Sequence, residues 1–258
     1  MRTDLFFFSG TGNTSLAARA VAEALRKAGH TVRPVAVESA DPEGYEPGDL
    51  LGIAFPAAAG ATYPFVLDFI GRLPSAEGTG AFLVVTMAAS AGGVSPRVRE
   101  ALAAKGYSPV GLLEVLMPTN FRRERDPGGE DDAVLARGME ESRGFAERLG
   151  EDAAEWPEGP GGFTRMVEEA QSLWRELRSR YRLSVAEDRC TGCGECADVC
   201  PVDNIVMEDG IPVFGDVCQV CMRCFSGCPE HAILVGGERY AQWRSARRPW
   251  EVDQAGDR

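Results

Sequence analysis

The sequence predicts an α/β protein in two parts: a doubly wound parallel sheet of five strands, followed by a small cysteine-rich domain. Two observations support this division. Short apolar runs alternate with helical patterns over the first 150 residues, which is typical of parallel strands with helices on both faces. All eight cysteines lie in one stretch that begins at Cys190 and ends at Cys228.

The first strand is expected at the apolar run 5–8, and a glycine loop and a helix follow it. Apolar residues recur at helical spacing from Leu16 to Leu25, and Gly29 is placed to end the helix. The N–H groups and the positive dipole end at a helix N-terminus can bind phosphate without a lysine. The loop lacks the lysine of a Walker A loop and the spacing of a dinucleotide loop, so it predicts a site for a terminal monophosphate. The alternative is a glycine-rich turn without a ligand. The residues of the loop are Ser9, Gly10, Thr11, Gly12, Asn13 and Thr14.

Further strands are expected at residues 31–37, 49–55, 81–87 and 111–117, with helices near 64–72, 95–105 and 131–149. Ligands bind such sheets beyond the carboxyl ends of the strands, where the strand order switches. Two further loops should meet the phosphate loop there, unless their small residues only make tight connections. The candidates are Pro56, Ala57, Ala58, Ala59 and Gly60 in the first loop, and Thr86, Met87, Ala88, Ala89, Gly92 and Gly93 in the second.

The segment between the sheet and the cysteines changes composition. Residues 151–162 are acidic and rich in Pro and Gly, and are expected to form an exposed linker. Apolar residues then follow helical spacing from Phe163 to Tyr181. We expect this helix to dock one domain against the other, because an exposed apolar stripe is costly; the alternative is a solvated spacer. Its arginines lie elsewhere on the surface: Arg175, Arg178, Arg180 and Arg182.

The eight cysteines form two copies of the pattern CxxCxxCxxxCP, which is typical of [4Fe–4S] ligands. In such runs three cysteines hold one cluster and the fourth holds the other cluster. The predicted ligand sets are Cys190, Cys193, Cys196 and Cys228 for one cluster, and Cys218, Cys221, Cys224 and Cys200 for the other. Structural zinc usually takes paired CxxC knuckles, often with histidine, and a disulfide framework requires an oxidising compartment. Both alternatives are therefore weaker.

On these motifs the chain resembles the flavodoxin–ferredoxin fusion proteins of anaerobic bacteria and archaea over nearly its whole length. Residues 9–14 are similar to the FMN phosphate loop of flavodoxins, and residues 184–236 to bacterial two-cluster ferredoxins. The resemblance implies a flavodoxin-like sheet, a small α+β ferredoxin domain, one FMN and two [4Fe–4S] clusters. Related proteins often carry a tyrosine at the position of Ala58. Tyr63 and Phe121 are either aromatic substitutes near the flavin or packing residues.

The expected domains are a flavodoxin-like domain at 1–150, a linker and docking helix at 151–183, a ferredoxin domain at 184–236 and a tail at 237–258. We expect an electron carrier that relays low-potential electrons between protein partners in anaerobic metabolism. The alternative is an FMN-dependent reductase of a quinone or an unsaturated compound, supplied by the ferredoxin domain. The lack of an acid–base set near the flavin loops favours the carrier. A minor alternative makes the ferredoxin domain a structural module without a redox role.

The formal net charge of −12 argues against non-specific binding of nucleic acid, which requires clustered Lys and Arg. It either steers the protein to basic surfaces of redox partners or serves solubility. The first ten residues hold too short an apolar run for a signal peptide or a membrane span, so a cytoplasmic location is expected. The polar part of the tail, residues 239–258, is expected to fold back on the acidic body or to contact a partner.

Overall fold

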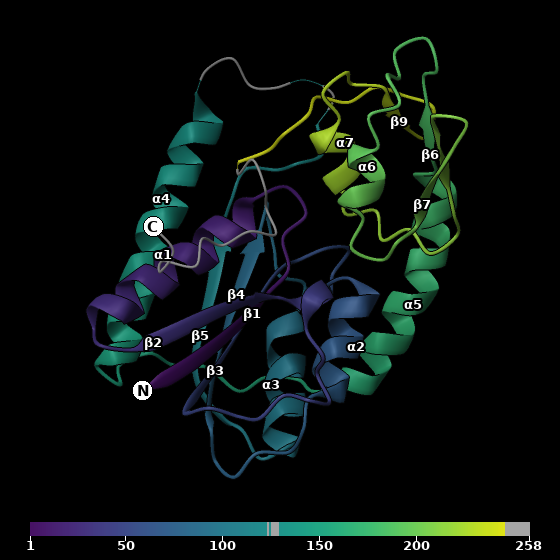
Figure 1. The fold of residues 1–258 in the computed structure, drawn as a ribbon. Helices are drawn as coiled ribbons and strands as arrows, with labels where there is room; N and C mark the ends of the chain where they lie inside the picture. The colour runs from purple at the N-terminus through teal and green to yellow at the C-terminus, as the bar shows by residue number, and fades with distance from the viewer. Residues whose placement is uncertain (123, 125–128, 246–258) are drawn as a thin grey trace.

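The computed structural model describes residues 1–122, 124 and 129–245. Its centre is a parallel sheet with the strand order β2-β1-β3-β4-β5, which is the flavodoxin-like order and confirms the predicted fold class (Figure 1). The ends of each predicted strand lie within three residues of the observed ends. The strands are β1 (Arg2–Phe7), β2 (Thr31–Ala36), β3 (Leu50–Pro56), β4 (Gly80–Met87) and β5 (Ser108–Leu116).

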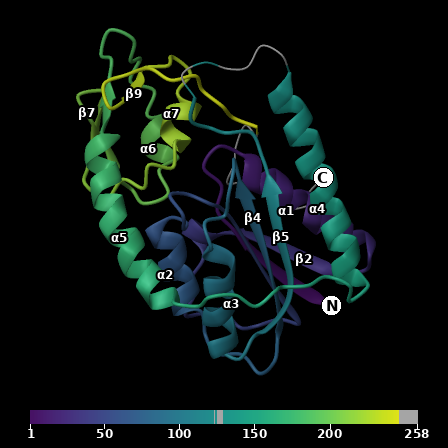
Figure 2. The same cartoon turned by 180° about the vertical axis from the view of Figure 1, so that it is seen from behind.

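Helices cover both faces of the sheet (Figures 1 and 2). One face carries α1 (Asn13–Lys27) and α4 (Glu130–Gly150), and the other carries α2 (Pro64–Arg72), α3 (Val94–Ala104) and α5 (Phe163–Arg180). A short 3₁₀ helix, η1 (Val37–Ser39), follows β2. Because successive side chains of a strand point to opposite faces, Phe6 and Phe8 belong to the core under α2 and α3, while Leu5 and Phe7 belong to the core under α1 and α4.

Local sequence explains where several of these helices begin and end. Pro64 occupies the first turn of α2, where its missing N–H is not needed. Gly29 adopts a φ of 91° just after α1, a conformation that glycine adopts without strain. At the start of α5, the N–H groups of Gly162 and Phe163 donate to the Glu100 carboxylate at 2.6 and 3.2 Å. These two hydrogen bonds lower the pKa of Glu100 and fasten α5 to α3.

The cysteine-rich part is a small α+β domain with its own apolar core. Antiparallel strands β6 (Leu183–Val185) and β9 (Ile233–Val235) tie its two ends together. The hairpin of β7 (Ile205–Glu208) and β8 (Ile211–Phe214) lies between the two cysteine runs, and α6 (Glu195–Asp198) and α7 (Arg223–Gly227) lie within them. Figure 1 shows this domain beyond the ends of β4 and β5, at the top of α5.

The linker before α5 differs in one respect from its prediction. Most of residues 151–162 are exposed, but Trp156 is buried in the core under α3. The N–H of Leu112 donates to the carbonyl of Glu155, and Arg99 donates to the carbonyl of Trp156. One large aromatic side chain therefore anchors a segment whose acidic composition predicts exposure throughout.

Candidate functional site

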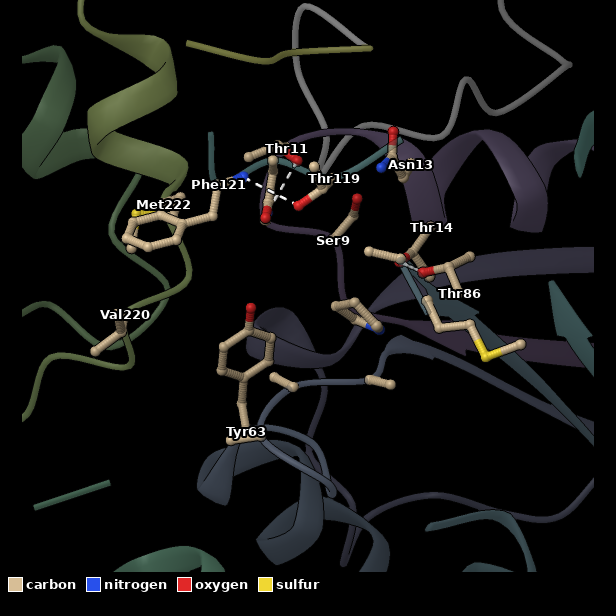
Figure 3. A pocket seen from close by; sticks show the side chains of 18 of the residues that line it. Ser9, Thr11, Asn13, Thr14, Tyr63, Thr86, Thr119, Phe121, Val220 and Met222 are labelled. Carbon is tan, nitrogen blue, oxygen red and sulfur yellow. Dashed lines mark hydrogen bonds between the residues drawn. The ribbon is translucent and has the colours of Figure 1, made fainter. Parts of the chain in front are cut away.

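A cavity of about 310 Å³ lies at the carboxyl edge of the sheet, between the sheet and the cysteine-rich domain. Loops after β1, β3, β4 and β5 form one wall. The other wall comes from α5 and from the second cysteine run, through Trp174, Leu177, Gln219, Val220 and Met222. Figure 3 shows Val220 and Met222 on one side of this space and Thr14 and Thr86 on the other.

Side-chain hydrogen bonds hold the phosphate loop after β1 in shape. The Ser9 hydroxyl accepts from the N–H of Gly12 at 3.1 Å, and the Ser15 hydroxyl donates to the carbonyl of Gly12 at 2.8 Å. Thr14 shares a 2.6 Å hydrogen bond with Thr86 at the end of β4. Because α1 begins at Asn13, the N–H groups of its first turn have no partner within the helix. The loop thus offers hydroxyls and backbone donors to an anion.

The two later loops meet each other beside the phosphate loop. A Cβ at Gly92 would collide with the backbone of Gly60, so the two loops touch at a point where position 92 can carry no side chain. Ala57 donates its N–H to the carbonyl of Thr86 at 2.8 Å, and Ala58 and Ala61 form a bridge within the first loop. This close approach explains why the sequence uses small residues here.

Most, but not all, of the predicted cofactor-binding residues line the cavity. Those that do are Ser9, Gly10, Thr11, Asn13, Thr14, Pro56, Ala57, Ala58, Ala59, Thr86, Met87 and Ala88. The predicted residues outside its lining are Gly12, Gly60, Ala89, Gly92 and Gly93. Gly12, Gly60 and Gly92 shape the loops instead, because each adopts a positive φ.

Both aromatic candidates, Tyr63 and Phe121, line the cavity and also pack against other rings. Tyr63 makes edge contacts with Phe8 and Trp174, and in Figure 3 its hydroxyl points into the cavity. Burial raises the pKa of Tyr63 far above its usual value, so the phenol stays protonated. Phe121 stacks on Tyr240 with ring centroids 4.4 Å apart. The packing role and the cavity-lining role therefore coexist in each side chain.

The eight cysteines line two small cavities, four cysteines to each. Cys190, Cys193, Cys196 and Cys228 line one of them. Cys200, Cys218, Cys221 and Cys224 line the other. In both sets the fourth cysteine comes from the other run, so the spatial grouping is the crossed one that the spacing predicts.

Burial lowers the acidity of several of the thiols. It raises the pKa of Cys196 to about 11 and of Cys221 to about 12, and that of Cys224 well above the ordinary thiol value. Buried thiols of this kind become ligands only when a metal centre displaces their protons. Backbone N–H groups donate to three sulfurs, those of Cys200, Cys218 and Cys228, as is common around iron–sulfur clusters.

The second of these sets, which contains Cys221, lies against the phosphate loop. A Cβ at Gly10 would collide with the carbonyl oxygen of Cys221, so only glycine allows this approach. Arg223 is 4% exposed and donates to the carbonyl of Ser9 at 2.8 Å and to Glu38 at 2.6 Å. The indole N–H of Trp174 donates to the carbonyl of Gln219 at 2.8 Å.

The C-terminal segment folds back over the phosphate loop. The indole N–H of Trp243 donates to the Asn13 side chain at 3.0 Å, and the N–H of Ser245 donates to the carbonyl of Thr11 at 2.9 Å. Residues 241–245 are called the strap below. The rest of the tail, including the basic and aromatic residues Arg247, Arg248 and Trp250, lies outside the described residues.

The wall of the cavity that comes from α5 and from the second cysteine run carries no signal in the sequence that marks it as part of a binding site. Trp174 and Leu177 are visible in the sequence only as members of an apolar stripe, and Gln219 and Val220 only as spacers between cysteines. The Oε1 atom of Gln219 is buried without a hydrogen-bond partner among the described residues, so the wall holds an acceptor for a donor on a bound group.

The chain was compared with family models, with curated proteins and with solved structures, and the cysteine-rich part and the sheet domain both have similar proteins. Residues 183–206 match a family model described as a 4Fe-4S binding domain. The chain is 39% identical over 56 residues to an uncharacterized ferredoxin of Methanocaldococcus jannaschii, a match covering 20% of this chain and 73% of that protein. It is 50% identical over 30 residues to Ferredoxin-3 of Desulfocurvibacter africanus, covering 12% of this chain and 49% of that protein.

Among solved structures, a flavodoxin of Streptococcus pneumoniae aligns with 58% of this chain and 99% of its own length, at 20% identity and a TM-score of 0.46. In the described part of the chain, no helix combines the length and the apolar character needed to cross a membrane.

Proposed function

We propose that this chain, which belongs to the ferredoxin family through its C-terminal part, couples an FMN at the sheet edge to two [4Fe–4S] clusters and relays single electrons between protein partners. One observation carries the proposal. The carbonyl of Cys221 lies against Gly10 of the phosphate loop, and its neighbours Val220 and Met222 wall the same cavity. A cluster held by Cys221 would adjoin a flavin bound in that cavity, and electron tunnelling requires short distances.

The residues present fit an FMN. The first turn of α1 and the hydroxyls of Ser9 and Thr11 would hold its phosphate, because they offer donors at a positive helix end. The loops that meet at Gly60 and Gly92 would bring backbone groups to the edge of the ring, and Tyr63 would donate its protonated hydroxyl. When bound, the flavin supplies an exchange of one or two electrons, while each cluster supplies one.

The cysteines fit two clusters with the crossed ligand sets. Cys200, Cys218, Cys221 and Cys224 would hold the cluster next to the flavin cavity, called here the inner cluster. Cys190, Cys193, Cys196 and Cys228 would hold the outer cluster. Arg223 of α7 would keep the inner cluster and the phosphate loop in a fixed relation, since it bonds to both Ser9 and Val199.

The lining of the cavity supports a carrier over a reductase. Within the described part of the chain, the side chains that face it are apolar, hydroxyl, amide or phenol groups, and none is a carboxylate, an imidazole or an amine. A reductase of a quinone or an unsaturated compound needs a proton donor as well as electrons, and the Tyr63 phenol is a weak acid because burial raises its pKa. We expect saturable turnover with such compounds to be absent in stopped-flow mixing of the reduced protein, while redox proteins reoxidise it.

Iron, sulfide and flavin analysis of anaerobically purified protein tests the cofactors directly. Two cubanes and one phosphate loop predict about eight iron atoms, eight sulfides and one FMN per chain. Four iron atoms would contradict the second ligand set. Full iron without flavin would contradict the assignment of the cavity.

A further inference from the structure

A second groove, distinct from the flavin cavity, lies beside the inner cluster. It has a volume of about 370 Å³ and runs between the last turns of α5 and the segment that follows β8. Three arginines and one ligand of the inner cluster, Cys218, share this groove. Its lining also includes Ser179, Tyr181, Leu183, Phe214, Gly215 and Asp216, beside Arg175, Arg178 and Arg182.

The charge of this groove is opposite to that of the molecule. The chain carries a formal net charge of −12, whereas the lining holds three arginines and one carboxylate, that of Asp216. Across the described residues, none of the three arginines lies within ion-pair distance of an acidic side chain, although other arginines such as Arg165 and Arg72 do. The dipole of α5 explains the presence of a cation at Arg178, in the last turn of the helix. It does not explain Arg182, which lies beyond the helix end.

Exposed valines lie next to the groove-lining residues in the sequence. Val213 and Val217 bracket its lining segment and are 43% and 54% exposed, and Val206, paired with Val213 across the hairpin, is 59% exposed. These valines are among the few large apolar side chains that the described surface leaves this open. Arginine is enriched in protein–protein interfaces, and the buried centre of such an interface is apolar.

We infer that this groove is the docking surface for an acidic one-electron redox protein that reacts with the inner cluster through Cys218. The inference rests on the proposed function. One electron leaves the reduced cluster and reduces the centre of the partner, or passes in the opposite direction, and no proton or covalent bond is exchanged. The partner is a protein, because charge complementarity and exposed valines together fit an acidic surface with an apolar centre.

The inner cluster can therefore exchange electrons on two sides. Val220 and Met222, the neighbours of Cys221, line the flavin cavity, while Cys218 lines the arginine groove. A docked partner therefore reaches the flavin through one cluster and without crossing the outer one. Long-range attraction by the groove should accelerate encounter with an acidic partner and weaken as salt is added.

The test compares two triple variants that remove the same charge from different places. The groove variant removes the three cations of the groove and carries Arg175→Gln, Arg178→Gln and Arg182→Gln. The α4 variant removes three arginines from α4 and carries Arg137→Gln, Arg143→Gln and Arg148→Gln. The probe is oxidised plant-type [2Fe–2S] ferredoxin, an acidic protein. Its dissociation constant is measured by calorimetry and its rate of reduction by stopped flow, both at low and at high salt.

We expect the groove variant to bind the probe about tenfold more weakly at low salt, which corresponds to about 1.4 kcal/mol, and the α4 variant to differ less than about twofold. Equal effects of the two variants, or wild-type binding that salt does not weaken, would overturn the inference. If the triple variant does not fold, Arg182→Gln alone should weaken binding in the same direction, and no weakening would overturn it. Iron and flavin contents of the same samples test the proposed function separately.

Discussion

At the scale of single residues, Arg223 does most to join the two domains. Its guanidinium is buried, bonds to the backbone of the phosphate loop and of the first cysteine run, pairs with Glu38, and lies over the Phe8 ring at 5.0 Å. A buried ion pair is costly to form, but removal of one partner leaves the other charge buried and unpaired. This predicts a strong and non-additive response to mutation.

Arg223→Gln is expected to lower the free energy of unfolding by about 3–5 kcal/mol, because Glu38 remains buried without its partner. Adding Glu38→Gln should recover part of the loss, since the unpaired charge disappears. Denaturant unfolding of the wild type, the two single variants and the double variant measures this cycle. Strict additivity of the two substitutions would contradict a coupled pair.

His30 predicts a pH dependence of stability. Burial lowers its pKa, and its Nδ1 lies 3.0 Å from the Thr3 hydroxyl. The unfolded chain therefore binds a proton more readily than the folded chain does, so the stabilising contribution is present above the unfolded pKa of about 6.5 and is lost as pH falls through the lower folded pKa. Between pH 7.5 and 5.5 the wild type should lose more stability than His30→Gln. Parallel losses in denaturant unfolding would contradict this assignment.

At the scale of elements, α5 and the strap hold the second domain and the flavin loops in place. Apolar spacing predicts that α5 packs, and Met166, Ala170 and Trp174 are indeed buried against the sheet domain. The strap was predicted only as a tail that either folds back or contacts a partner. Its contacts depend on Asn13 and Thr11, more than two hundred residues away, and no local pattern of polar residues specifies such a pairing.

Trp243→Phe tests whether the strap helps to retain the flavin. Phenylalanine keeps the ring but cannot donate to Asn13, and loss of one such hydrogen bond costs about 0.5–1.5 kcal/mol. FMN should therefore dissociate about two- to tenfold faster, as measured by the recovery of flavin fluorescence. Ser245→Ala is the control, because it removes only the long 3.4 Å hydrogen bond from the Ser245 hydroxyl to Thr11, while the backbone N–H of Ser245 still donates to Thr11 at 2.9 Å. An unchanged rate in Trp243→Phe would show that the strap does not secure the site.

Much of the architecture could be predicted because it follows from local patterns. The strands, the phosphate loop and the cysteine spacing depend on short-range periodicity and turn chemistry. The remaining wall of the cavity could not be predicted, because Gln219 and Val220 occupy positions that cluster ligation does not constrain. Their role arises from the packing of α7 and α5 on the sheet edge. Trp156 lies in an acidic linker, and its burial likewise results from tertiary packing that no local sequence pattern indicates.

At the scale of the whole molecule, the inner cluster lies between the flavin cavity and the arginine groove and adjoins both. Gly10 and Cys221 make the first junction, and Cys218 makes the second. Each cysteine run contributes its fourth cysteine to the other ligand set, so the inner and outer clusters would form one rigid unit. The arrangement is that of an electron-transfer protein in which domain packing sets the distance between redox centres.

The central claim is that electrons pass within one molecule between the flavin and the clusters. Flash photoreduction of the anaerobic protein, with flavin and cluster absorbance recorded together, tests it most directly. The account predicts a phase in which the two absorbances change in opposite senses, at a rate that does not depend on protein concentration. A rate that rises with protein concentration, or the absence of such a phase, would contradict it.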